Sequence, residues 1–189
     1  MKATELLAKQ HQIVQARIEG LRGFSNAEWM PRPGPDRNRI GFTAWHMVAT
    51  RDWTIRAILQ GATPLGWDAP FAGTGVARCA IPFGMSLPEA DSIAEAVAPA
   101  EVAAYSEGVT GEILRWLERT DDSVLESPPT NGRAHLALSP RYSEPAYRFE
   151  LDSNPAPMTD WPTWQLLSRP AFAHCLFHLE EMEFARANV

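Results

Sequence analysis

Four long stretches of the chain repeat their apolar residues every three or four positions, and segments rich in proline and glycine separate one stretch from the next. This spacing places the apolar side chains on one face of an α-helix, and proline or glycine ends the helical pattern. We therefore predict helices over residues 4–22, 39–60, 86–119 and 161–187. No part of the chain predicts a sheet with comparable strength, so an all-α fold is expected.

Local signals mark where these helices begin, break and end. Gly61 follows the second helix as a stop, and Ser86 forms a capping box with Glu89 at the start of the third. Because proline lacks a backbone N–H, Pro99 is expected to break or kink the third helix. In the fourth helix, Pro170 either introduces a kink or starts the second half.

The 189 residues suit one domain, 1–189, and four helices of this length imply a four-helix bundle with two long loop insertions. The insertions are residues 62–85 and 120–160. The first of them permits a crossover that leaves the second and third helices parallel. Within the second, residues 133–139 and 146–152 alternate apolar and polar side chains, which indicates a small hairpin.

Composition and charge exclude several classes of function. A net charge of −6 and a pI near 5.4 do not match a nucleic-acid-binding surface, which needs clustered lysine and arginine. No apolar run is long enough to span a membrane, and the N-terminus lacks the apolar core of a signal peptide. The two cysteines do not form a disulfide framework. We expect a soluble, cytoplasmic protein that acts on a small molecule, with no nucleic-acid or membrane partner.

Two histidines lie four residues apart near the C-terminus, in the segment "FAHCLFHLEE". Positions i and i+4 of a helix share a face, so the rings of His174 and His178 can meet at one ion. Glu181 lies on the same face. Either the two histidines are ordinary core or rim residues, or they hold a metal ion with a third ligand from elsewhere.

His46 is the candidate for that third ligand, because it lies at the centre of the most apolar helix. Burying an unpaired imidazole there costs on the order of 1–3 kcal/mol, and a metal ion in the core would satisfy all three rings. His11 also lies on the apolar stripe of its helix. It either faces a cofactor or is a core histidine satisfied by hydrogen bonds. The chain contains neither HExxH nor Glu-x-x-His, so a single ion is favoured over a zincin or di-iron site.

The segments "NRIGFTAWHMVATRDW" and "FAHCLFHLEEME" resemble the metal-ligand segments of DinB-like proteins. The superfamily also contains mycothiol-dependent maleylpyruvate isomerase and bacillithiol transferase. The resemblance covers all four expected helices in order. It implies that His46, His174 and His178 bind the metal, that the fold is an up-down-down-up four-helix bundle, and that the protein is a homodimer.

Three neutral histidines leave a divalent ion with its full charge and an open coordination position. A thiol bound there loses its proton, whereas a bound water becomes hydroxide. Imidazole ligands suit zinc, nickel, iron and copper, and zinc or nickel is expected first. Glu181 is a candidate for orienting a ligand or moving a proton. Arg51 and Arg56 are either holders of a cofactor carboxylate or ordinary surface cations.

These observations support a metal-dependent transferase or isomerase that uses a small thiol such as mycothiol, bacillithiol or glutathione. A non-enzymatic metal- or ligand-binding bundle and a metal-dependent hydrolase are the alternatives. In the enzyme hypothesis, residues 62–85 and 120–160 are expected to lie over the histidines, because a reactive thiolate needs shielding from water.

Overall fold

Every regular element in the described part of the chain is a helix. That part comprises residues 1–68, 71–78, 85–130 and 158–187 of a computed structural model. The all-α prediction is therefore confirmed for these residues, and the expected hairpin lies outside them. Within the same ranges, no helix is long and apolar enough to cross a membrane.

The first helix, α1, runs from Ala3 to Glu19 and continues as a short 3-10 turn, η1 (Gly20–Gly23). Its buried stripe is the one that the periodicity predicts. The carboxylate of Asp122 accepts hydrogen bonds from the backbone N–H groups of Ala3 and Thr4, at 3.0 and 3.1 Å. Asp122 belongs to a short helix, α6 (Asp122–Leu125), so this capping contact ties α6 to the start of α1.

The second predicted helix is continuous but changes its pitch. It begins as α3 (Ile40–Asp52) and continues as a π-helix, η2 (Trp53–Leu59). Gly61 follows with a φ of 62°, a conformation that glycine adopts without strain. A short helix, α2 (Asn26–Trp29), precedes α3. Almost every side chain of α3 is buried, as its composition predicts.

The third predicted helix is divided into α4 (Leu87–Ala96) and α5 (Pro99–Glu118). Val97 has extended backbone angles, φ −105° and ψ 131°, and Ala98 before Pro99 is also extended. The indole N–H of Trp29 donates to the carbonyl oxygen of Val97 at 2.9 Å. Pro99 therefore breaks the helix, and Trp29 satisfies one of the carbonyl groups that the break exposes.

The last predicted helix consists of α9 (Thr163–Ser168), a π-turn η8 (Arg169–Ala173) and α10 (His174–Ala187). Pro170 lies in the π-turn. Because proline has no N–H to donate and its ring crowds the preceding turn, the wider π-turn accommodates it without ending the helix. The π-turn ends where the first of the paired histidines begins α10.

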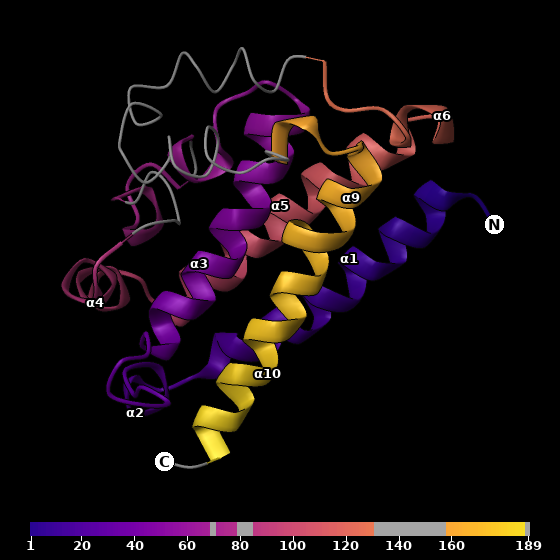
Figure 1. The fold of residues 1–189 in the computed structure, drawn as a ribbon. Helices are drawn as coiled ribbons and strands as arrows, with labels where there is room; N and C mark the ends of the chain where they lie inside the picture. Colours follow the sequence, from indigo (N-terminus) through magenta and orange to yellow (C-terminus); the bar gives the residue numbers. More distant parts are fainter. Residues whose placement is uncertain (69–70, 79–84, 131–157, 188–189) are drawn as a thin grey trace.

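The long helices pack side by side around a large apolar core (Figure 1). α1 lies against α5 and α10, and α3 lies against the same two helices. In Figure 1, α1 and α10 descend toward the lower left, whereas α3 and α5 rise away from it. Fully buried members of the core include Ile18, Trp45, Ile113 and Leu167. Burial of such side chains removes apolar surface from water and holds the helices together.

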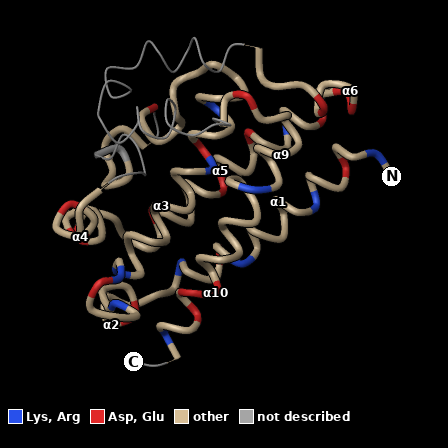
Figure 2. Tube along the Cα trace, in the orientation of Figure 1, with Lys and Arg blue, Asp and Glu red and all other residues tan. Residues whose placement is uncertain are grey.

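Charged residues are interspersed by sign along the described helices (Figure 2). Lys and Arg do not form a continuous basic face on the part of the chain drawn in colour, and acidic residues lie beside many of them. Several of these neighbours form ion pairs, for example Arg17 with Glu183 at 2.7 Å between α1 and α10.

Candidate metal centre

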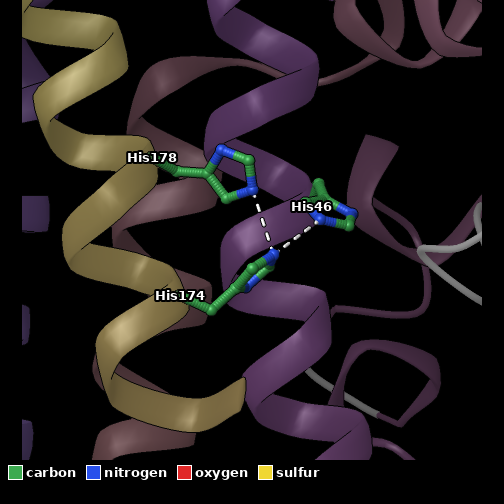
Figure 3. A group of neighbouring side chains, drawn as sticks. All are labelled: His46, His174 and His178. Carbon is green, nitrogen blue, oxygen red and sulfur yellow. Dashed lines mark hydrogen bonds between the residues drawn. The ribbon is translucent and has the colours of Figure 1, made fainter. Parts of the chain in front are cut away.

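Two facing helices bring three histidines together. His46 comes from the middle of α3, and His174 and His178 come from the first turns of α10 (Figure 3). The Nε2 atom of His174 lies 3.3 Å from Nε2 of His46 and 3.0 Å from Nε2 of His178. One ring nitrogen from each of the three residues lies within 4.8 Å of the others.

These distances suit a common ion. Zinc binds imidazole nitrogen at roughly 2.0–2.1 Å, so two ligands of a tetrahedral ion are separated by roughly 3.3 Å. The two Nε2–Nε2 distances, 3.0 and 3.3 Å, are close to that separation. Two facing imidazole nitrogens can share one proton in an N–H···N hydrogen bond. Three converging nitrogens cannot all be paired in this way, whereas a cation accepts the lone pairs of all three. The residues present therefore fit a divalent metal ion.

Glu181 fixes the orientation of one ring. Its Oε2 atom lies 3.0 Å from Nδ1 of His178, one helical turn away. With the His178 proton on Nδ1, donated to this carboxylate, Nε2 keeps its lone pair for the centre of the group. Helical spacing explains the contact, because positions i and i+3 are neighbours on a helix surface.

The other two rings lie in different surroundings. The ring of Phe42, one turn before His46 on α3, stacks on the imidazole with a centroid distance of 5.7 Å and an interplanar angle of 16°. Burial, followed by the charge of His178, lowers the pKa of His174 to about 4. His174 is therefore neutral at pH 7 and available as a ligand. Its Nδ1 atom is buried and has no hydrogen-bond partner among the described residues.

A pocket of about 340 Å³ opens onto His46 and His178. Its size lies at the small end of the range for ligand sites. Phe42, Met85 and Phe177 form an apolar part of its lining. The connection between α2 and α3 forms a polar part, with residues 36–38. The residue pattern of this connection does not predict that it lies at the site. Its one relevant feature in the sequence is its position directly before the histidine-bearing helix.

His11 is buried, as the apolar stripe of α1 predicts, but it is not part of the three-histidine group. Its ring meets Phe172 edge-on, with centroids 6.4 Å apart. Neither ring nitrogen has a hydrogen-bond partner among the described residues. Burial, with a smaller contribution from the charge of Arg51, lowers its pKa well below 6.5. His11 is thus a neutral core histidine in this structure.

The two arginines of α3 and η2 do not line the pocket either. Arg51 is fully buried and donates to the hydroxyl oxygens of Ser106 and Thr110, at 3.1 and 2.9 Å. Arg56 forms ion pairs with Asp68 at 3.3 Å and with Glu112 at 3.7 Å. The structure therefore places Arg51 in the core and Arg56 at the far end of the helix from His46, where it holds the following connection.

Asp52, which is buried between the packed helices, anchors the same connection. Its carboxylate accepts hydrogen bonds from the backbone N–H groups of Leu65 and Gly66, both at 2.9 Å, and from the Tyr105 hydroxyl at 2.5 Å. Leu65 begins a 3-10 turn, η3 (Leu65–Trp67). Burial raises the pKa of Asp52 in spite of these donors.

The structure tests the expected loop cover over the histidines only in part. Among the described residues of the first insertion, Met85 lines the pocket, whereas Leu65 and Gly66 are held against Asp52 and Tyr105. A further 3-10 turn, η4 (Gly75–Arg78), packs against α4 and α5. Most of residues 120–160 lie outside the described part of the chain.

The regular elements in the described ranges are all helices, and two neighbouring ones bring three histidines together, so these residues define a helical protein with a candidate metal centre between its packed helices. The family model described as the DinB superfamily matches residues 6–182. The chain belongs to this superfamily, as the two histidine segments indicated. No curated protein matches the chain significantly.

Proposed function

We propose that the protein binds one divalent metal ion through His46, His174 and His178, and that it uses the ion in a transfer or isomerisation reaction with a small thiol. The observation that carries this proposal is the convergence of three Nε2 atoms, with adjacent pairs 3.0 and 3.3 Å apart. Membership of the DinB superfamily adds support for metal binding.

The residues of the site have distinct roles in this proposal. The three imidazoles hold the ion, and the carboxylate of Glu181 keeps the His178 proton on Nδ1. Phe42 fixes the plane of the His46 ring by stacking. Glu181, which contacts one of the three histidines, is also a candidate for moving a proton. It can do so only when the hydrogen bond to His178 is given up, so we assign it the orienting role first.

A divalent ion held by His46, His174 and His178 would supply positive charge, which favours the thiolate form of a bound thiol at neutral pH. Phe42, Met85 and Phe177 would place apolar side chains beside the bound thiol. Zinc or nickel is the proposed ion, because imidazole ligands suit both.

The proposal extends to the assembly and location of the protein. We propose an up-down-down-up four-helix bundle, supported by the directions of α1, α3, α5 and α10 in Figure 1. A cytoplasmic homodimer completes the proposal. Phe177 and Phe184 are 64% and 66% exposed on α10, which gives that helix apolar surface for a second copy to cover.

The activity is tested with a thiol and a small aromatic chloride, with metal-loaded and metal-free protein compared. The thiolate sulfur forms a C–S bond, the C–Cl bond breaks, chloride leaves, and the thiol proton passes to buffer. Mycothiol, bacillithiol and glutathione are compared, with His46→Ala as the variant without a complete site. A metal-dependent rate that is absent in the variant supports the proposal. Metal binding without any rate would favour the non-enzymatic alternative, and metal-dependent ester cleavage without thiol would favour the hydrolase.

A further inference from the structure

The connection between α2 and α3 is held in one place by arginines. Arg39 donates to the carbonyl oxygen of Met30 and to the carboxylate of Asp91, both at 3.0 Å. Arg32 also pairs with Asp91, and it donates to the backbone carbonyl oxygen of Arg37 at 3.0 Å. Three prolines within residues 31–35 further limit the backbone. The connection is thus fixed against α4, which carries Asp91.

The tip of this connection carries two charges that are not neutralised. Asp36 and Arg37 are both exposed, and both line the pocket that opens onto His46 and His178. Neither side chain forms an ion pair or a hydrogen bond with any residue that the structure describes. The neighbouring Arg32 and Arg39 are both paired with Asp91, so within this connection it is the two charged residues at the pocket that keep their charges available.

The third charged residue of the pocket is already engaged. Glu181 accepts the hydrogen bond from His178 Nδ1, at 3.0 Å. A ligand that reaches the three histidines therefore meets one available carboxylate and one available guanidinium, on adjacent residues of a fixed connection. Guanidinium groups bind carboxylates through paired N–H donors, and a carboxylate binds an ammonium group.

We infer that Asp36 and Arg37 select a zwitterionic ligand, namely a small thiol that carries both an ammonium group and a carboxylate. The thiol sulfur faces the histidines, the carboxylate binds Arg37 and the ammonium group binds Asp36. This inference rests on the proposed function, because it assigns the thiol to the metal site. It makes Asp36 and Arg37 specificity-determining residues, and it disfavours thiols without charge.

The test uses cobalt-loaded protein and follows the sulfur-to-cobalt absorption band as thiol is added. Four thiols distinguish the two charged groups of the ligand. Cysteine carries both an ammonium group and a carboxylate, cysteamine carries only the ammonium group, mercaptopropionate carries only the carboxylate, and mercaptoethanol carries neither. Each variant is compared with the wild type for the same thiol, so that differences in thiol acidity cancel. Arg119→Gln, on the exposed end of α5 away from the pocket lining, is the matched control.

Arg37→Gln is expected to weaken the binding of cysteine and of mercaptopropionate by about three- to fivefold. The binding of cysteamine and of mercaptoethanol should not change. Asp36→Asn is expected to weaken the binding of cysteine and of cysteamine by a similar factor, and to leave the binding of the other two thiols unchanged. If the affinity for all four thiols changed equally, or for none of them, the inference would be overturned. The presence of the absorption band would still show that thiols bind at the metal. Cobalt binding with no band from any thiol would overturn the proposed thiol chemistry and this inference with it.

Discussion

Oε2 of Glu181 lies 3.0 Å from Nδ1 of His178, so a carboxylate contacts the outer nitrogen of one of the three converging histidine rings. Such a partner fixes the tautomer of the ring and raises the basicity of the opposite nitrogen, which is the one that faces His174. Substitution of Glu181 therefore tests whether the three histidines form a metal site or are only neighbours.

Glu181→Ala is expected to lower zinc affinity by about 10- to 100-fold, because His178 loses the group that holds its proton on Nδ1. Glu181→Gln keeps an acceptor oxygen and should lose less. The measurement is competition with a chromophoric chelator. Glu180→Gln is the matched control, since Glu180 is the adjacent residue and is exposed. Equal affinities for Glu181→Ala and the control would show that the carboxylate does not support a ligand.

Asp52→Asn is expected to lower the free energy of unfolding by about 1–3 kcal/mol, because the amide cannot accept all three hydrogen bonds that Leu65, Gly66 and Tyr105 donate. Tyr105→Phe removes one donor and should cost about 1 kcal/mol. Urea unfolding of the metal-free protein measures both. Zinc affinity should stay at the wild-type value, and a large loss of affinity would instead connect Asp52 to the metal site.

Arg51→Met is expected to leave the free energy of unfolding unchanged or to raise it by up to about 2 kcal/mol. Arg51 is fully buried, and its guanidinium contacts hydroxyl groups and no carboxylate among the described residues. Replacing such a cation by an apolar side chain of similar length removes its desolvation cost. Ser106 and Thr110 remain satisfied, because both also donate to Gln15. Thermal and urea unfolding measure the change, and a marked destabilisation would show that the charge supports the fold.

His11 predicts a pH dependence of stability for the metal-free protein. Burial holds its folded-state pKa well below 6.5, so the unfolded chain binds this proton more readily. Below about pH 6.5 the unfolded chain takes up a proton on His11 while the folded protein does not. The free energy of unfolding of the wild type therefore falls as the pH is lowered toward the folded-state pKa. His11→Leu removes this dependence. When the pH is lowered from about 7.5 to about 5, the free energy of unfolding of the variant should therefore rise relative to that of the wild type by roughly 1 kcal/mol or more. A difference that is constant with pH would contradict the assignment.

The helices were predictable because their apolar spacing is strong and most of their ends carry recognisable residues. Pro99 is a clear example: its ring excludes a helical conformation for the residue before it, and the chain breaks there. Pro170 was ambiguous from sequence, because a proline inside a helix can be accommodated by a kink, a break or a wider turn. The structure has a π-turn at that position.

The candidate site was predictable to the extent that it depends on helix geometry. His174 and His178 share a face by their spacing, and His46 stood out as a polar residue in an apolar helix. Asp36 and Arg37 could not be assigned, because their place at the pocket depends on how Asp91, more than fifty residues later, holds the connection. The complete burial of Arg51 was missed for a related reason. A charged residue on a helix is usually exposed, and the burial of Arg51 depends on tertiary packing, including that of α5 against α3.

The most direct test of the central claim is the metal content of protein purified without a histidine tag and then equilibrated with zinc. About one zinc ion per chain is expected for the wild type, and close to none for His174→Ala, whose helical content by circular dichroism should be retained. His11→Leu, which also removes a buried histidine, should bind as the wild type does. One ion per chain in both the wild type and the His174→Ala variant, or none in either, would contradict a metal centre formed by His46, His174 and His178.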